Sequence, residues 1–240
     1  GNVAICSPFW RTFVRSSVVM QWIEEGYQML WAVEAPQRKE MENSSSALEH
    51  NGFVKNAVAE MVAERAITML PPGEKPWVVS PLGVVPKKGT DKFRLTVNMR
   101  YVNKHLGEKA FKFEGLKDLA DLAKRGDHAV SYDLMSGYYH VGLDPRSRTF
   151  VGFKWGGQYY VYNCLPFGMS TAPWVFSKVM RELVMYWRKG GIRLLPYPYD
   201  FLFMVKGFWQ CARLARKVEA DFVFAILRIN VPKCHTLPAQ

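Results

Sequence analysis

Three hairpin patterns constrain the fold of this chain more than any other feature of its sequence. In each pattern, two apolar or alternating runs flank a short turn, which is typical of paired antiparallel strands. The turns lie at residues 88–91, at Gly156-Gly157 and inside "LLPYPYDFLFMV" at 194–205. Another apolar run, within "HAVSYDL" at 128–134, has the pattern of a buried strand. The sequence therefore predicts a sheet that contains antiparallel strands.

Helical periodicity separates these strand patterns. Helices are predicted over the start of 10–34 and over 53–69, 115–125, 171–190 and 207–228, and the last of these is basic. The polar stretch at 35–52 is predicted to be an exposed connection, and "INVPKC" at 229–234 to be a closing strand. Because helices and strands are mixed without strict alternation or an internal repeat, the predicted fold class is α+β.

Composition supports one large globular unit or two subdomains that share a core. The chain has 240 residues, is 49% hydrophobic and carries 8 Trp, 11 Tyr and 15 Phe, which excludes a disordered chain. No run approaches the ~18 apolar residues of a transmembrane helix, so no membrane span is predicted. The first residue is Gly, as expected of a processed product or a fragment.

The chain is strongly basic, with a net charge of +11. Residues 1–120 contain 16 basic and 13 acidic residues, whereas residues 121–240 contain 16 basic and 8 acidic ones. Such a balance favours a polyanionic partner, most often nucleic acid, although general solubility is the alternative reading. Arg213, Arg216 and Lys217, in the basic helix, are candidates for an RNA-binding surface.

The four cysteines indicate a reducing, intracellular compartment, and a mitochondrion or another organelle is compatible with them. Cys6, Cys164, Cys211 and Cys234 form no C-x-x-C pair and have no histidine at ligand spacing, so a structural zinc site is not expected.

Asp133 is the first candidate for a chemical role. It ends the strand pattern in "AVSYDLMSGYYHV", where a turn residue is the alternative. Its surroundings favour function, because Tyr138 and His140 follow it, "LPFGMSTAPWVFSKVM" comes at 165–180, and the third hairpin then carries Asp200.

This order of motifs resembles the reverse transcriptase domain of retroelements, and most of all the DIRS type, which carries a tyrosine recombinase. The likeness covers roughly residues 10–240, and five segments carry its motifs: "SPLGVVPKKGTDKFRLTVNMRYVN" (the fingers hairpin), "SYDLMSGYYHVGL" (motif A), "LPFGMSTAPWVFSKVM" (motif B), "YPYDFLF" (motif C) and "INVPKCHTLPAQ" (motif D). It implies the fingers and palm of a right-hand polymerase, with fingers at about 80–125 and 145–170, a palm at about 126–144 and 171–240, and a helical N-terminal extension over 1–75. The thumb, which follows motif D in the family, is not expected in these 240 residues.

The resemblance also implies site residues. In the family, carboxylates of motifs A and C hold two Mg²⁺ ions that orient the attacking and leaving oxygens of nucleotide addition. The matching positions are Asp133 and Asp200 for metal, Lys88 and Arg94 for the incoming triphosphate, Tyr138 for exclusion of a ribose 2′-OH, Phe167 and Gly168 for the motif B turn, and Lys233 for the motif D lysine. The alternatives are ordinary packing for Tyr138 and Phe167 and solvated hairpin charge for Lys88 and Arg94.

Motif C departs from the family pattern Tyr-x-Asp-Asp. Tyr199 stands where the first Asp belongs, and a phenol with an ordinary pKa near 10 is a poor Mg²⁺ ligand. Pro198 and Pro196 are expected to loosen the hairpin, because proline is poorly tolerated in paired strands. Asn98, where the family often has Asp, is a lesser departure.

Three functions follow from these patterns. The first is a catalytically inactive, reverse-transcriptase-like protein that binds RNA as a structural subunit of a larger ribonucleoprotein, for instance a ribosome, with neighbouring proteins as further partners. It needs no cofactor and no small-molecule substrate. The second is an active RNA-directed DNA polymerase that uses Mg²⁺. The third is a protein-interaction scaffold without RNA, whose positive charge meets acidic partners.

Overall fold

The computed structural model describes residues 3–107, 109–110, 114–197 and 199–239 and shows two compact units. Unit 1 comprises Glu25–Lys109 and Val141–Ala172, and unit 2 comprises Asn2–Glu24, Ala110–His140 and Pro173–Gln240. Of the residues predicted to form an N-terminal extension, the described ones up to Glu24 belong to unit 2 and those from Glu25 to unit 1. Residues 110–125 belong to unit 2 and residues 141–144 to unit 1, while the boundaries given for fingers and palm stay a prediction.

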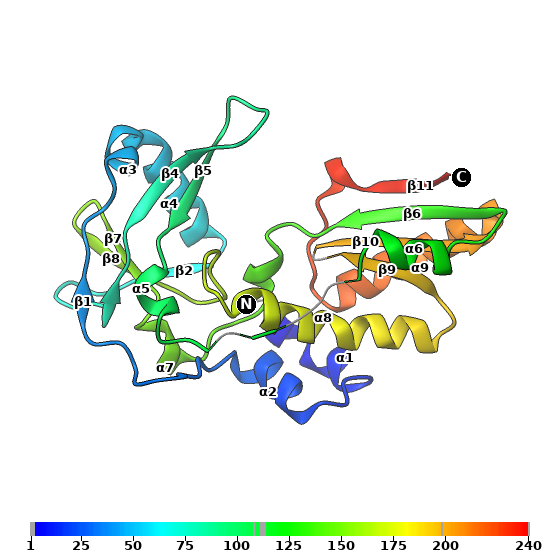
Figure 1. Cartoon of the computed structure of the whole chain (residues 1–240), viewed down its shortest axis with the longest axis horizontal. Coiled ribbons are helices and arrows are strands. Elements are labelled where there is room, and N and C mark those ends of the chain that lie inside the picture. The colour runs from blue at the N-terminus through cyan, green and yellow to red at the C-terminus, as the bar shows by residue number, and fades with distance from the viewer. Residues whose placement is uncertain (1–2, 108, 111–113, 198, 240) are drawn as a thin grey trace. The chain divides into compact units, whose positions relative to one another are not determined.

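Unit 1 contains a five-stranded sheet and a separate two-stranded hairpin (Figure 1). The strand order in the larger sheet is β1-β3-β7-β8-β2, and β4 pairs with β5. The elements are β1 (Lys39–Glu40), α3 (Ser45–Glu49), α4 (Asn51–Ala63), β2 (Ile67–Met69), β3 (Val78–Val79), β4 (Leu82–Pro86), β5 (Phe93–Val97), α5 (Arg100–Asn103), α7 (Pro145–Arg148), β7 (Gly152–Trp155) and β8 (Gln158–Tyr162).

Both hairpins predicted in this unit are present. The β4–β5 turn spans the residues between Pro86 and Phe93, and the β7–β8 turn is Gly156-Gly157, where φ is 56° and 78°. Two glycines with positive φ suit a tight hairpin turn, because a side chain at either position would be strained.

The helix predicted over 53–69 ends earlier than expected. α4 stops at Ala63, Arg65 takes a φ of 56°, and Ile67–Met69 form strand β2, which pairs with Tyr162 and the residues before it. The apolar residues Ile67 and Met69 therefore belong to a strand of the sheet and do not continue the helix. The stretch at 35–52, predicted to be an exposed connection, holds β1 and α3.

Unit 2 is a four-stranded sheet with helices against it, and its strand order is β11-β6-β10-β9 (Figure 1). Its elements are η1 (Val3–Cys6), α1 (Ser7–Arg11), α2 (Ser17–Glu25), α6 (Leu116–Leu122), β6 (Asp127–Asp133), η2 (Gly137–His140), α8 (Ala172–Lys189), β9 (Arg193–Tyr197), β10 (Asp200–Lys206), α9 (Phe208–Phe224), η3 (Val231–Lys233) and β11 (His235–Ala239). The closing strand predicted at 229–234 is wrong. That segment forms η3, whose first turn contains Pro232, and the closing strand is β11.

Aromatic packing joins α8 and α9 to one face of this sheet. The Trp187 ring of α8 lies 5.7 Å from Phe201, 5.0 Å from Phe203 and 5.4 Å from Phe222 of α9. The Trp187 indole also donates a 2.8 Å hydrogen bond to Asp221. Since successive side chains of a strand point to opposite faces, the side chain of Asp200, next to Phe201, lies on the face that these helices leave uncovered.

No helix in the described part of the chain combines the length and apolar character that a membrane span requires.

Candidate functional site

Two carboxylates meet at one end of the central strand pair of unit 2. Asp133 is the last residue of β6 and Asp200 the first of β10, and the antiparallel register places them directly opposite each other. Both segments are apolar strand formers with an aspartate at the end, so strand pairing itself brings the two acids together.

Asp133 is held by residues that follow α9. The Asn230 side-chain amide donates a 2.8 Å hydrogen bond to Asp133 Oδ2, and the Asn230 backbone N–H donates one of 2.7 Å to the Asp133 carbonyl. Lys233 Nζ lies 3.4 Å from the same Oδ2 atom. The segment predicted as motif D thus supplies both a neutral donor and a cation to the Asp133 carboxylate. Asn230 was not identified from the sequence, because its hydrogen bond to Asp133 joins residues 97 positions apart.

The pKa of Asp200 is raised above its ordinary value. Burial is the largest cause, followed by the charge of Asp133 and a hydrogen bond with it, while Lys233 acts in the opposite direction. Two carboxylates that face each other in a partly desolvated place disfavour simultaneous ionisation. A proton or a hard cation between them would relieve this repulsion.

Tyr199, at the position predicted to have lost its carboxylate, is packed into an aromatic group. Its ring lies 5.1 Å from Tyr138 and 5.5 Å from Phe176. Burial, with a hydrogen bond that the Tyr199 hydroxyl donates to Tyr138, raises the pKa of the Tyr199 phenol above its ordinary value, so the group is neutral near pH 7. The ring also covers Gly137, where a Cβ atom would stand 2.3 Å from Tyr199 Cδ1. Tyr199 therefore contributes shape to the site and no negative charge.

The hairpin that carries Tyr199 is regularly paired on both sides of its turn. β9 and β10 keep one register from Arg193↔Met204 to Tyr197↔Asp200, with Pro196 opposite Phe201. The expected loosening by Pro196 is wrong, since β9 is an edge strand, where a missing N–H is tolerated. Pro198 lies outside the described residues.

The donor set matches one divalent ion better than two. Asp133 and Asp200 offer the hard oxygen ligands that Mg²⁺ prefers. Among the described residues, no group of three or more His, Cys, Asp or Glu side chains could hold a metal ion. With a neutral phenol at the third position, the described side chains at this site offer a metal ion two carboxylates, those of Asp133 and Asp200.

The remaining predicted residues lie in unit 1 or on α9. Lys88 belongs to the β4–β5 turn and Arg94 to β5, and both are exposed. The side chain of Phe167 is 44% exposed. Gly168 has a φ of 94°, and a Cβ atom at this position would lie 3.1 Å from the Val97 carbonyl oxygen, which is a tight contact. The structure thus groups Asp133, Tyr138, Tyr199, Asp200 and Lys233 in unit 2 and places the predicted triphosphate and motif B residues in unit 1.

The basic helix is shorter than predicted. α9 ends at Phe224, so Arg228 lies beyond it. Arg213 and Arg216 are exposed on α9, whereas Lys217 pairs with Asp221 at 2.7 Å.

Comparison with known proteins gives consistent matches. The family model described as reverse transcriptase (RNA-dependent DNA polymerase) matches residues 85–240. The Pol polyprotein of transposon 412 from Drosophila melanogaster is 35% identical over 106 residues, which are 42% of this chain and 9% of that protein. The enzymatic polyprotein of cauliflower mosaic virus (strain Strasbourg) is 31% identical over 103 residues, which are 43% of this chain and 15% of that protein.

Solved structures support the same fold. The foamy viral protease–reverse transcriptase in complex with an RNA/DNA hybrid matches 85% of this chain and 26% of its own, with a TM-score of 0.69 and 16% identity. The form of that enzyme in complex with double-stranded DNA matches 85% of this chain and 34% of its own, with a TM-score of 0.64 and 17% identity. At this identity the likeness shows the fold, and the predicted α+β fold of fingers and palm is confirmed.

Proposed function

Because the chain belongs to the reverse transcriptase (RNA-dependent DNA polymerase) family, we propose that it is a polymerase-type domain that binds nucleic acid without extending a primer. The observation that carries the proposal is the neutral, packed phenol of Tyr199 beside Asp133 and Asp200. When bound, Mg²⁺ supplies charge neutralisation at the reacting phosphate, and the residues that would hold it here are those two carboxylates.

The chain's own residues support binding better than catalysis. Asn230 and Lys233 orient and partly neutralise Asp133, while Tyr138 and Tyr199 fill the space beside it with aromatic rings. Phosphate contacts need charge and shape and no carboxylates, so the exposed Lys88 and Arg94 remain suitable for a nucleic acid backbone. One structural relative was solved with an RNA/DNA hybrid and with double-stranded DNA, which makes these reasonable first ligands.

The finer assignments belong to the same proposal. A structural role in a ribonucleoprotein, such as a ribosome in an organelle, follows from the net charge of +11 combined with the lost carboxylate. The assignment to the DIRS type of retroelement rests on the residues of the five motifs alone. A tyrosine recombinase encoded beside this domain would support it. Since the chain spans 9% and 15% of the two relatives above, the activities of those whole polyproteins are not carried over.

An active polymerase is the second candidate, because Asp133 and Asp200 keep the register that metal binding requires. Primer extension with Mg²⁺ and with Mn²⁺ separates the two, using the wild-type chain, Tyr199→Asp, and Asp133→Ala as the inactive control. Filter binding of an RNA/DNA hybrid is measured on the same samples. We expect wild type to bind the hybrid without extending it.

Extension by wild type that disappears in Asp133→Ala would overturn the proposal. If neither wild type nor Tyr199→Asp extends the primer, the Mn²⁺ affinities of the two proteins are compared by titration followed by electron paramagnetic resonance. This comparison tests whether Tyr199 limits metal binding. Adding one carboxylate ligand should tighten Mn²⁺ binding at least about tenfold in Tyr199→Asp, since removing an ion's ligand typically weakens affinity on this scale or more. Equal Mn²⁺ affinity would show that Tyr199 is not what limits the site. Absence of nucleic acid binding would favour the protein-interaction scaffold instead.

A further inference from the structure

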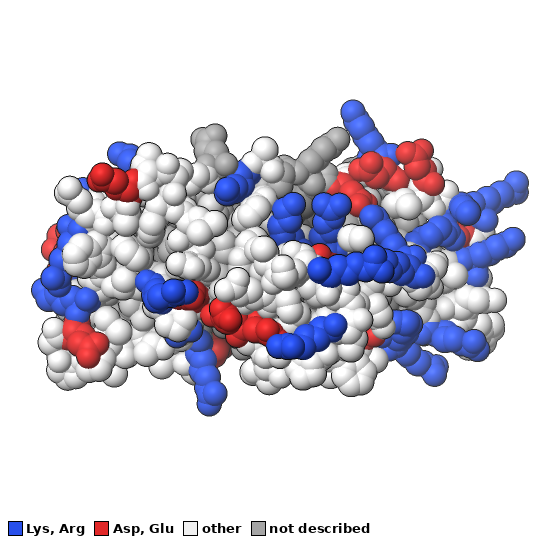
Figure 2. Space-filling model, turned by 90° about the horizontal axis from the view of Figure 1, so that it is seen from below, with Lys and Arg blue, Asp and Glu red and all other residues white. Residues whose placement is uncertain are grey.

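Unit 2 carries a second basic surface, on the side of its sheet opposite the two carboxylates. α8 and α9 cover the face to which Phe201 and Phe203 point, whereas Asp200 belongs to the other face. Figure 2 shows many Lys and Arg side chains gathered on the right-hand part of the face that it presents. A ligand on this surface would therefore be separate from one at Asp133 and Asp200.

The outward side of α8 forms a cationic stripe. Helical spacing places its members on one face of the helix: Trp174, Lys178, Arg181, Met185, Arg188 and Lys189. Arg181, Met185, Arg188 and Lys189 are exposed, and Lys178 and Trp174 are half-buried. We call this set the α8 stripe. From Lys178 to Arg188 it is about 15 Å long, at about 1.5 Å per residue.

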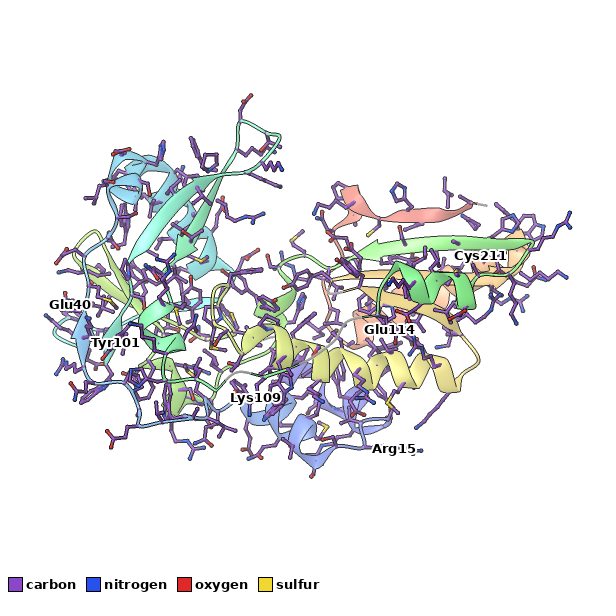
Figure 3. The ribbon with its side chains drawn as sticks, viewed as in Figure 1. Arg15, Glu40, Tyr101, Lys109, Glu114 and Cys211 are labelled. Carbon is purple, nitrogen blue, oxygen red and sulfur yellow. The ribbon has the colours of Figure 1, made fainter. Side chains whose placement is uncertain are left out.

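Among the described residues, the ion pair that the α8 stripe makes with an acidic side chain lies at one of its ends. Arg188 pairs with Glu114 at 2.6 Å, and Figure 3 shows Glu114 beside α8. In the part of the chain that the structure describes, no acidic side chain pairs with Lys178, Arg181 or Lys189. Two neighbouring cations with no ion-pair partner among the described residues suit the phosphates of a nucleic acid backbone.

Aromatic rings lie at the other end of the stripe. Lys178 Nζ is 5.9 Å from the Trp174 ring centroid, and Trp174 meets Trp22 of α2 edge to face at 5.4 Å. Cations next to aromatic rings are the combination by which proteins hold single-stranded nucleic acid, through phosphate contacts and base stacking. An acidic protein partner would use the cations but would gain little from the ring at the end of the row.

We propose that the α8 stripe binds the backbone of a single-stranded nucleic acid, as a second site on the back of unit 2. The inference rests on the proposed nucleic acid binding but is independent of the carboxylate site. It assigns α8 a role beyond packing. Arg213 and Arg216 of α9 are not needed for it.

Fluorescence anisotropy with a labelled 12-nucleotide RNA tests the site, using the full chain in 0.1 M salt. Lys178→Gln/Arg181→Gln is compared with Lys55→Gln/Lys104→Gln, which removes the same charge from exposed positions of unit 1. Loss of two single-strand phosphate contacts predicts about 20-fold weaker binding for the α8 variant and a salt slope smaller by about 1.4. The control variant should stay within about twofold of wild type.

Equal affinities of the two variants, or failure of wild type to bind this single-stranded RNA, would overturn the α8 site, whereas failure of wild type to bind the RNA/DNA hybrid would overturn the proposed function. Photocrosslinking of wild type to a 4-thiouridine RNA keeps the test valid if the α8 variant folds poorly. Crosslinks in the peptide that contains Trp174 are expected, and crosslinks confined to other peptides would refute the site. DNA of the same sequence should bind within about threefold, and a strict preference for RNA would contradict backbone recognition.

Discussion

At the scale of single residues, the Tyr199 ring occupies the space that a side chain at position 137 would need, so it requires glycine there. A Cβ at Gly137 would stand 2.3 Å from Tyr199 Cδ1 and 3.2 Å from Phe176 Cζ, and Tyr199 cannot swing away because Tyr138 and Phe176 pack against it. We expect Gly137→Ala to lower the free energy of unfolding by about 1–3 kcal/mol through overpacking. Urea unfolding monitored by circular dichroism measures it.

The double variant supplies the control for this placement of Tyr199. In a Tyr199→Ser background the ring is gone, so Gly137→Ala should cost less than about 1 kcal/mol, and the two changes should couple as neighbours do. An undiminished cost in that background would mean that the Tyr199 ring does not lie over Gly137.

The same residues show what the sequence could and could not foretell about the site. The loss of a carboxylate at position 199 could be predicted from the sequence, because it depends only on which residue type stands at that position of the motif. The packing of the Tyr199 ring could not be predicted, because the ring lies over Gly137 and against Phe176. These two residues are 39 positions apart in the chain. Asn230 was missed for a related reason, since its hydrogen bonds to Asp133 join segments distant in sequence.

At the scale of elements, an ion pair fixes the starts of two strands of the unit 2 sheet. Arg193, the first residue of β9, donates to both carboxylate oxygens of Asp127, the first residue of β6, at 2.5 and 2.6 Å. These hydrogen bonds lower the pKa of Asp127 to about 2. Both side chains are largely covered, so the pair is shielded more than an ordinary surface ion pair.

The pair makes a defined contribution to the pH dependence of stability. Because the folded-state pKa of Asp127 is below its ordinary value of 3.8, the stabilisation is fully present above about pH 4 and is lost as the pH falls towards 2. We expect it to be about 2 kcal/mol, from the size of the pKa change. The measurement compares wild type with Asp127→Asn in urea at pH 6 and at pH 2.5. A stability difference between the two proteins that does not shrink at the lower pH would contradict the prediction.

Element boundaries were predictable where local chemistry decides them and unpredictable where pairing decides them. The β7–β8 turn followed from two adjacent glycines, Gly156 and Gly157. By contrast, Ile67–Met69 continues the apolar pattern of α4 and became β2 because strand β8 offers a partner. The helix predicted over 207–228 was too long at its end, because α9 stops at Phe224. Ile226 takes a φ of 50°, and this local backbone change leaves no trace in the helical periodicity.

At the scale of the whole molecule, the fold class was predictable from local patterns, whereas the predicted division into fingers and palm came from the resemblance. The order of strand and helix patterns along the chain is a one-dimensional property, and it was enough to predict α+β. Each unit, however, is assembled from separate stretches, with Val141–Ala172 returning to unit 1 after unit 2 has begun at Ala110. The local strand and helix patterns do not encode such a return, whereas the resemblance to the reverse transcriptase domain predicted one, with a second stretch of fingers at about 145–170.

The net charge of +11 gives the last prediction, which concerns the whole chain. If the partner is nucleic acid, the logarithm of the affinity for an RNA/DNA hybrid should fall linearly with the logarithm of salt concentration. Each phosphate contact to a duplex contributes a slope of about −0.9, so four or five contacts give about −4. Filter binding between 50 and 400 mM salt measures the slope, with Lys88→Gln/Arg94→Gln expected to reduce its magnitude by up to about 2. A slope near zero, or one unchanged in that variant, would mean that these cations do not hold a phosphate backbone, and the scaffold hypothesis would then account better for the charge.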